Sequence, residues 1–421
     1  MEEHKSMPKD KGLDHTLSVL REGYEFIFNR RNKYESNIFE TKVLGKKTIC
    51  LTGKEAAELF YDNDKFKRSG AAPKHVQKTL FGENGVQALD GEEHHHRKAM
   101  FMSLMTNDAL SEIAELTKKH LNAFAAQWET KEKIIVYEEA KKVLTHVACE
   151  WTGVPLQDDE VELRKKQLAD MFESAASIGP EYWRGRKSRT SAEEWMEDLV
   201  QKVRNGEINP PSHRALNQFS VHRDLEGELL DKQVVAVELL NLLRPIVAIS
   251  VYMSFTVLAL IEHSDEVSSL KSGNEQDKQY FIQEVRRYYP FFPFAGARVK
   301  KDFTWKGYDF EEGTLTLLDL YGTNHHPEVW RDPKVFIPAR FKSWQGSPFD
   351  FIPQGGGEFD FGHRCAGEWL TLEVLKETLN YFVNHLTFDV PEQDFTYSMS
   401  EMPSLPKSGI QLTNIVRPTN R

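Results

Sequence analysis

The sequence predicts a mainly α protein with small β-sheets, an α+β fold. Residues 106–204 carry apolar side chains mostly at helical spacing, and residues 229–263 form the longest helical run. Two short runs near the N-terminus, residues 38–44 and 48–52, have the β-branched and aromatic side chains that favour strands. No repeat, low-complexity tract or linker is evident, so we expect one compact domain spanning residues 1–421.

The first sixty residues are expected to mix helix and strand. Apolar residues recur at helical spacing over 14–35, which predicts a helix. The two strand-like runs flank Gly45-Lys46-Lys47, which predicts a hairpin. Thr52 and Glu55 fit a capping box, so the helix that follows is expected to be capped by the Thr52 side chain.

Residues 64–105 are rich in turn-forming residues and resemble an active-site segment built from loops. Within it, His94-His95-His96-Arg97-Lys98 falls at a predicted helix start. The three histidines could bind a metal, but adjacent side chains on a helix point in different directions. The alternative is a partly solvated helix start with one or two residues turned inward, whose positive side chains could also hold a buried carboxylate.

Composition narrows the class of protein. The 421 residues carry a net charge of −10, which argues against nucleic acid or an anionic membrane as the main partner. The cysteines Cys50, Cys149 and Cys365 are odd in number and far apart, which indicates a reducing, cytoplasmic location and no disulfide framework. Cys50 and Cys149 fit inert packing positions. The segment MEEHKSMPKDKGLD has no apolar core, so we expect no signal peptide.

The long helical run contains an apolar stretch, Ile246–Ile261, of 16 residues. Because about 20 residues are needed to span a bilayer, we interpret it as a buried core helix and expect no membrane span. Just before it stand Arg244 and Pro245. Pro245 cannot donate to the Asn241 carbonyl, so a kink or opening is expected. A buried Arg244 needs an anionic partner, either an acidic side chain or the carboxylate of a ligand.

A second charged group lies downstream. Glu284 and Arg287 are three residues apart on a predicted helix and share a face. Arg340 follows in the stretch FIPARF. The three side chains could form a solvated surface group or a buried Glu–Arg–Arg cluster.

Residues 350–370, DFIPQGGGEFDFGHRCAGEWL, place Cys365 in a Gly-rich loop just before a helix. Backbone N–H groups and the positive end of the helix dipole favour a thiolate there. A thiolate in such a position can act as a nucleophile, as half of a redox pair or as a metal ligand.

An E-x-x-R helix, an F-x-P-x-R-F stretch and a Gly-rich Cys loop, in that order, resemble a cytochrome P-450 over nearly the whole chain. The resemblance implies a single cytochrome P-450 domain, residues 1–421, with a long central helix over a haem. It implies that Cys365 is the axial ligand of the iron of haem b. Glu284, Arg287 and Arg340 would form the structural triad, and Arg68, His94 and Lys98 would contact the haem propionates.

The sequence departs from the general pattern in four places: Pro353 lies twelve residues before Cys365, which lengthens the loop; His363 stands where Arg is usual; Ala339 replaces a Glu; and Arg244-Pro245 replaces an acid–Thr pair. The last change resembles the bacterial fatty-acid peroxygenases of this superfamily, which include hydroxylating and alkene-forming members. The stretches TLFG, DGEEHHHRKAMFMSLM, EVRRYYPF, GSPFDFIPQGGG and HRCAGEWL resemble the same group.

This resemblance implies that the carboxylate of a long-chain fatty acid pairs with Arg244 and supplies the acid–base function. Hydrogen peroxide would be the oxidant, no redox partner would be obligatory, and oxidation would fall on the α or β carbon, with alkene as a minor product. Arg244, Pro245 and Gln87 would be the catalytic residues. Candidates for the substrate channel, with simple core packing as their alternative, are Phe81, Phe291, Phe292 and Phe294.

Gln87 bears on the outcome of the reaction. By the resemblance it aligns with a position that is Gln in hydroxylating members and His in the well-known decarboxylating one. A Gln amide does not titrate near neutral pH, which favours hydroxylation. Residue 87 could instead only shape the pocket. The remaining alternatives are a fatty-acid decarboxylase, a monooxygenase that needs a redox partner, and a non-enzymatic haem sensor or carrier.

Overall fold

The computed structural model describes residues 4–272 and 274–418. Residues 1–3, which begin the N-terminal segment in which we expect no signal peptide, lie outside the described residues. The helices of eight or more residues are α2 (Phe26–Tyr34), α5 (Gly91–Met102), α6 (Asn107–Trp128), α7 (Val136–Thr152), α8 (Val161–Glu173), α9 (Pro180–Arg204), α11 (Lys232–Glu262), α12 (Ser264–Ser272), α13 (Glu275–Tyr288) and α15 (Glu368–Asn384). Shorter helices are α1 (Thr16–Glu22), α3 (Lys54–Phe60), α4 (Lys74–Val76), α10 (Ala215–Ser220) and α14 (Leu320–Asn324). A π-helical turn, η2 (Gln77–Phe81), and a 3₁₀ turn, η3 (Val86–Ala88), precede α5.

The strands form three sheets. The largest has the order β1-β2-β8-β5-β3, the second β4-β10-β9 and the third β6-β7. Their bounds are β1 (Ile38–Val43), β2 (Lys46–Leu51), β3 (Phe66–Lys67), β4 (Lys133–Ile135), β5 (Phe294–Val299), β6 (Phe303–Trp305), β7 (Tyr308–Phe310), β8 (Leu315–Asp319), β9 (Thr387–Asp389) and β10 (Gln411–Val416). The predicted mainly α fold with small sheets is confirmed.

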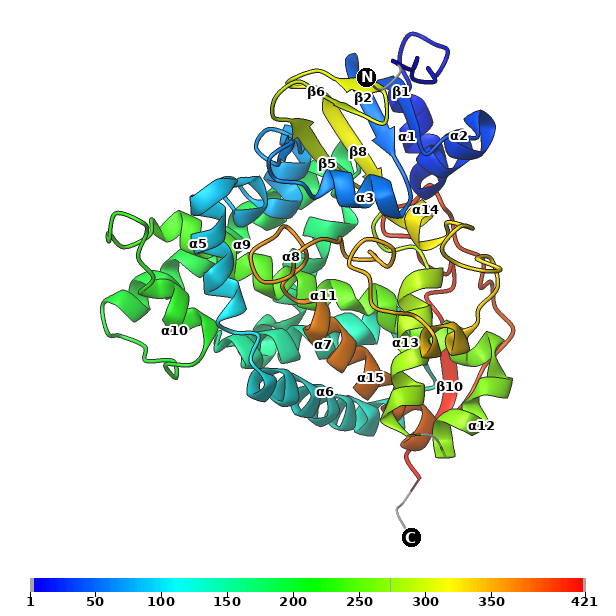
Figure 1. Ribbon diagram of the computed structural model, residues 1–421. Coiled ribbons are helices and arrows are strands. Elements are labelled where there is room, and N and C mark those ends of the chain that lie inside the picture. Colours follow the sequence, from blue (N-terminus) through cyan, green and yellow to red (C-terminus); the bar gives the residue numbers. More distant parts are fainter. Residues whose placement is uncertain (1–3, 273, 419–421) are drawn as a thin grey trace.

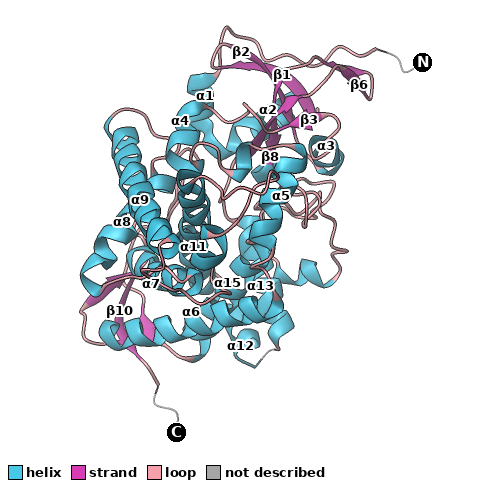
Figure 2. Ribbon diagram, turned by 90° about the vertical axis from the view of Figure 1, so that its left-hand side faces the viewer, coloured by secondary structure: helices cyan, strands magenta, loops and turns pink. Residues whose placement is uncertain are grey.

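The large sheet and α1–α3 lie at one end of the molecule, while α6 and β10 lie at the other (Figures 1 and 2). The predicted hairpin is present: β1 and β2 pair antiparallel from Ile38 opposite Leu51 to Val43 opposite Lys46. Leu44 and Gly45 form its turn with φ of 54° and 70°, the left-handed conformation that a two-residue hairpin turn requires.

The helix α11 runs through the middle of the helical part (Figures 1 and 2) and packs against α7, α8, α9 and α15. By length and composition it could cross a membrane, but 89% of its most apolar stretch is buried within the fold. The apolar sequence is therefore explained by a helix that neighbours cover on all sides. Helical geometry continues through Pro245, although the Asn241 carbonyl loses its ordinary N–H donor there.

The predicted capping box at α3 is wrong. Gly53 is the N-cap residue, and no side chain caps the helix. The Thr52 hydroxyl instead donates a hydrogen bond to Asp319 Oδ2 at 3.5 Å, at the end of β8. The Asp319 carboxylate also accepts a hydrogen bond from the Gly322 N–H. The Thr52 side chain is therefore bound to a distant segment and does not cap the helix as the local sequence pattern predicted.

Candidate active site

One face of α5 turns three positive or titratable side chains inward. Asp90 precedes the helix, and His94, Arg97 and Lys98, at helical spacing, are buried. His95 is exposed and His96 half-buried, so the three histidines do not converge. Within the described residues, no group of three His, Cys, Asp or Glu side chains is arranged to hold a metal ion. The interpretation as a helix start with residues turned inward fits this geometry.

Cys365 faces this side of α5. It precedes α15, whose N-cap residue is Gly367, and the Lys98 ammonium donates to the carbonyl oxygen of Arg364 next to it. Burial raises the pKa of the Cys365 thiol, while the Lys98 charge and the Gly367 N–H act in the opposite direction. Burial thus opposes the effect of the helix start on the thiol. A coordinated metal cation would favour the thiolate.

Arg244, on α11, is close enough to Cys365 for the two charges to interact. The residue is 6% exposed, its Nη2 donates to Asn241 Oδ1 at 3.3 Å, and its Nε has no hydrogen-bond partner among the described residues. Burial, together with nearby Arg189, lowers the pKa of Arg244 to about 9, and Cys365 opposes the shift. No carboxylate among the described residues forms an ion pair with Arg244. Of the two alternatives predicted from the sequence, an acidic protein partner is thus excluded for residues 4–272 and 274–418.

A buried polar network beside Arg244 was not predicted as a unit. Glu238, fully buried on α11, accepts hydrogen bonds from Arg97 Nη1 at 2.9 Å, Val86 N at 2.8 Å and Asn241 Nδ2 at 2.9 Å. Burial raises the pKa of Glu238, and Arg97 opposes that shift. The positive helix start of α5 therefore does hold a buried carboxylate. A single Glu in the apolar run VVAVELLNLL was the available sequence signal.

Gln87 joins the same network from η3. Its Oε1 accepts a hydrogen bond from Asn241 Nδ2 at 3.2 Å, and its side chain is half-buried. Asn241 thus connects Gln87, Glu238 and Arg244. The side-chain amide of Asn241 therefore lies between Gln87 and Arg244, the two residues singled out from the sequence.

Glu284, Arg287 and Arg340 also come together. Glu284 and Arg287 are fully buried and form a bidentate pair with both N···O distances at 2.7 Å. Arg340 Nε lies 3.1 Å from Glu284, and the Ile337 N–H donates to the same carboxylate at 2.7 Å. The side chains therefore form a buried cluster that ties α13 to the FIPARF segment, and not a solvated surface group.

Comparison with known protein families and solved structures identifies proteins that share this sequence pattern and fold. The family profile described as Cytochrome P450 matches residues 279–414. The structure of cytochrome P450EX alpha (CYP152N1) with myristic acid superposes with a TM-score of 0.95 at 53% identity, covering 98% of this chain and all of that one. This chain belongs to the cytochrome P450 family. The predicted resemblance to the fatty-acid peroxygenase group is confirmed by further CYP152 structures.

Two other solved P450s and one curated relative extend the comparison. Cytochrome P450SP alpha (CYP152B1) in complex with (R)-ibuprophen has a TM-score of 0.95 and 43% identity, covering 96% of this chain and all of that chain. A variant of cytochrome P450 OleT in complex with arachidonic acid has a TM-score of 0.96 and 39% identity, with 99% and 100% covered. Beta-amyrin 28-monooxygenase of Saponaria officinalis is 24% identical, over 92% of this chain and 84% of the relative.

Membership in the P450 family implies a haem, and the side chains beside Cys365 fit an anionic cofactor. Arg68 Nη1 is buried without a partner, and burial lowers the pKa of Arg68 to about 10. The His94 ring lies 3.9 Å from the His363 ring, and the pKa of His94 falls to about 4 through burial and the nearby Lys98. Arg68 and Lys98, both desolvated cations, are suited to the negative propionates of a haem, and the neutral His94 ring can donate one N–H to them.

The four phenylalanines predicted to line the substrate channel of this P450 do not all lie in the same part of the fold. Phe81 and Phe291 are half-buried against the large core around α11, and Phe291 stacks on Tyr252 with ring centroids 4.2 Å apart. Phe294, on β5, packs instead against the cluster between α2 and the sheet. Phe292 is 38% exposed. Phe81 and Phe291 therefore share the core that contains the site, and Phe294 and Phe292 do not.

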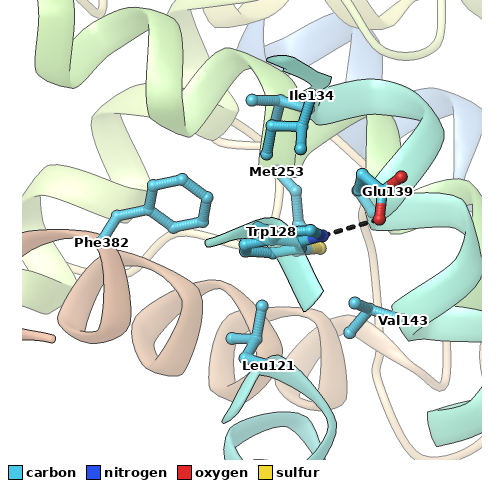
Figure 3. A pocket seen from close by; sticks show the side chains of 9 residues that line it. Leu121, Trp128, Ile134, Glu139, Val143, Met253 and Phe382 are labelled. Carbon is cyan, nitrogen blue, oxygen red and sulfur yellow. Dashed lines mark hydrogen bonds between the residues drawn. The ribbon is translucent and has the colours of Figure 1, made fainter. Parts of the chain in front are cut away.

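A small cavity of about 10 Å³ lies away from these residues, among α6, β4, α7, α11 and α15. Trp128 lines it, in the middle of the view in Figure 3, and its indole nitrogen donates to Glu139 Oε2 at 2.6 Å. The other walls are apolar and include Leu121, Ile134, Val143, Met253 and Phe382. Because the polar groups of the cavity satisfy each other and its volume is that of about one water, we interpret it as a packing defect.

Proposed function

We propose that this P450 is a hydrogen-peroxide-dependent peroxygenase that hydroxylates long-chain fatty acids at the α or β carbon. The observation that carries the proposal is Arg244, a buried guanidinium without an anionic partner in the described part of the chain. Leaving a charge buried and unpaired costs several kcal/mol, so its retention favours a ligand that supplies the countercharge. A carboxylate matches the planar fork of an Arg side chain.

The known complexes support a fatty acid as that ligand. Cytochrome P450EX alpha, 53% identical, is solved with myristic acid, and the P450 OleT variant with arachidonic acid. The core around Phe81 and Phe291 offers an apolar environment for an acyl chain. A carboxylate held at Arg244 places the α and β carbons nearest the Cys365 side of the site, which is the basis for the proposed regiochemistry.

In the proposed mechanism, Cys365 would ligate the haem, and Arg68, His94 and Lys98 would hold its propionates. The haem would supply the oxidation of a C–H bond by hydrogen peroxide. Residues 243–246 of α11 are Leu-Arg-Pro-Ile, so no acid–alcohol pair is available there to move protons. The substrate carboxylate on Arg244 would take that role, accepting a proton from peroxide and returning it to the oxygen that leaves as water. Asn241 Oδ1 accepts a hydrogen bond from the guanidinium and helps to hold it. No electron-transfer partner enters this scheme.

The test is turnover of myristic acid with peroxide alone, in the wild type and in Arg244→Ala and Arg244→Lys variants. Removing one partner of a buried charge pair costs about 2–5 kcal/mol, so Arg244→Ala is expected to lose about 30-fold or more in kcat/KM. Arg244→Lys keeps the positive charge but not the planar fork of the guanidinium. Its kcat/KM should therefore lie between those of the wild type and Arg244→Ala.

Two results would contradict the proposal. Full activity of Arg244→Ala on long-chain acids would show that Arg244 does not anchor the substrate carboxylate. Turnover only in the presence of a reductase would favour the monooxygenase that needs a redox partner. The carbon monoxide complex of the reduced protein tests the ligand separately. A band of the histidine-ligated type would exclude Cys365.

A further inference from the structure

A side chain of the Gly-rich loop lies behind the sulfur of Cys365. Gln354 Nε2 is 3.9 Å from Cys365 Sγ and 3.1 Å from Thr371 Oγ1, while Gln354 Oε1 accepts a hydrogen bond from Arg286 Nη2 at 3.0 Å. A carboxamide nitrogen carries two N–H donors, so it can serve the sulfur and the hydroxyl together. Both N–H donors and one acceptor position of the amide are thereby used.

The orientation of this amide follows from chemistry. A guanidinium only donates hydrogen bonds, so the carbonyl oxygen of Gln354 has to face Arg286. The NH₂ group then has to face Cys365 and Thr371. Turning the amide over would set its N–H groups against the guanidinium and its oxygen against the sulfur.

Buried partners hold Arg286 in place. Arg286 is 1% exposed and pairs with Glu368 Oε1 at 2.7 Å, and its Nη1 donates to Gln283 Oε1 at 2.5 Å. Glu368, also 1% exposed, accepts from Arg364 Nε at 2.6 Å through its other oxygen. Because the Arg286–Glu368 pair is desolvated and each partner makes a further hydrogen bond, the Gln354 amide has little freedom to turn away from the sulfur.

We propose that Gln354 donates a hydrogen bond to the Cys365 thiolate and thereby limits its electron donation to the haem iron, with Arg286 and Glu368 as positioning residues. The inference rests on the haem ligation given under the proposed function. An N–H dipole directed at the sulfur stabilises its negative charge, which weakens donation to iron and raises the reduction potential. The lengthened loop before Cys365 thus contains a residue that tunes the metal.

The experiment measures the reduction potential of the haem-loaded protein, wild type and variants, together with the spectrum of the carbon monoxide complex. Gln354→Leu removes the donor at similar volume, and Gln354→Glu removes it while adding negative charge. Both are expected to shift the potential to more negative values. We expect the reduction equilibrium to change two- to tenfold for Gln354→Leu, the upper limit being about 59 mV, and further for Gln354→Glu.

Gln167→Leu is the matched control, since Gln167 is also a buried glutamine bonded to an arginine, Arg164, but stands on α8 outside this network. It should leave the potential and the spectrum unchanged. An unchanged potential in both Gln354 variants, or an equal shift in Gln167→Leu, would overturn the inference. If the wild-type spectrum itself lacks a thiolate-type band, the haem ligation fails as well, so the two failures are distinguishable.

Discussion

At the scale of single residues, Gln87 is placed where it can influence the proton balance of the site. Its Oε1 accepts from Asn241, which also contacts Arg244 and Glu238. An amide at this position provides hydrogen bonds but neither binds nor releases a proton near neutral pH. A histidine of comparable reach would titrate there.

Gln87→His is therefore expected to raise the fraction of terminal alkene among the products of myristic acid and peroxide, at the expense of hydroxy acid. Gas chromatography of the products measures the ratio. Gln87→Met is the control, because it is similar in size and cannot titrate, and it should keep hydroxylation dominant. Equal ratios in the two variants would mean that residue 87 only shapes the pocket.

Residues also show how far the sequence predicts the site. Arg244 and Glu238 are recognisable because each interrupts an apolar helix that has to be buried. The partner of Glu238 is not, because Arg97 is 141 positions away and nothing local marks it. Gln354 gives no sequence signal of its own, since Cys365 lies 11 positions and Arg286 68 positions away from it.

At the scale of elements, the pair Arg97–Glu238 joins α5 to α11 and also holds the turn that carries Gln87, through the Val86 N–H. Both side chains are buried. Such a pair contributes little net stability compared with apolar packing, but breaking it leaves one charge without compensation.

Glu238→Gln is expected to destabilise the protein by about 3–5 kcal/mol, because Arg97 loses its countercharge while the Val86 N–H keeps an acceptor. Adding Arg97→Met should recover most of that loss. Urea unfolding of the two single variants and the double variant closes a double-mutant cycle. Additive losses would show that the two side chains are not energetically coupled.

A second junction, at the end of β8, predicts a pH dependence. Asp319 accepts from the Gly322 N–H at 2.6 Å at the start of α14, and burial raises the pKa of Asp319 to about 7. The folded state therefore holds a proton that the unfolded chain, with a pKa near 3.8, releases. Stability from this group is present at low pH and is lost as the pH rises from about 4 to about 7.

Asp319→Asn should remove this dependence. The difference in unfolding free energy between variant and wild type, measured in urea at pH 5, 6, 7 and 8, should move in favour of the variant by up to about 1.4 kcal/mol per pH unit below pH 7. Above pH 7 it should level off. A difference that does not vary with pH would show that Asp319 is ionised throughout.

The elements were predicted best where their pattern is local. The helices of residues 16–34, the hairpin and the long buried helix follow from periodicity and turn residues in their own segments. The capping box failed because Thr52 is engaged by Asp319, 267 positions away. The glycine run after Gln354 has a similar non-local cause: a Cβ at Gly357 would lie 2.9 Å from the Tyr61 ring, so α3 presses on this loop.

At the scale of the whole molecule, an unpaired Arg244 inside the fold makes global stability sensitive to the ligand that pairs with it. A molecule that binds only the folded state stabilises it by mass action. At a hundredfold excess over its Kd the gain is about 2.7 kcal/mol.

Myristic acid is therefore expected to raise the Tm of the haem-loaded protein in the absence of peroxide, and methyl myristate, which lacks the charge, to raise it much less. In Arg244→Ala the acid and the ester should act alike. Calorimetry or the loss of circular dichroism on heating measures the shifts. A similar shift from both ligands in the wild type would assign the binding energy to the acyl chain alone.

The contact between Lys98 and the Arg364 carbonyl has a consequence for biosynthesis. The two residues are 266 positions apart. At about 5–20 residues per second, a ribosome needs roughly 15–50 s to make the chain between them. During that time the loop that contains Arg364 has not been made, so Lys98 on α5 lacks this partner. The entropy cost of closing so long a segment also opposes an early contact between the two residues. A site that needs both segments is therefore complete only at the end of translation or later.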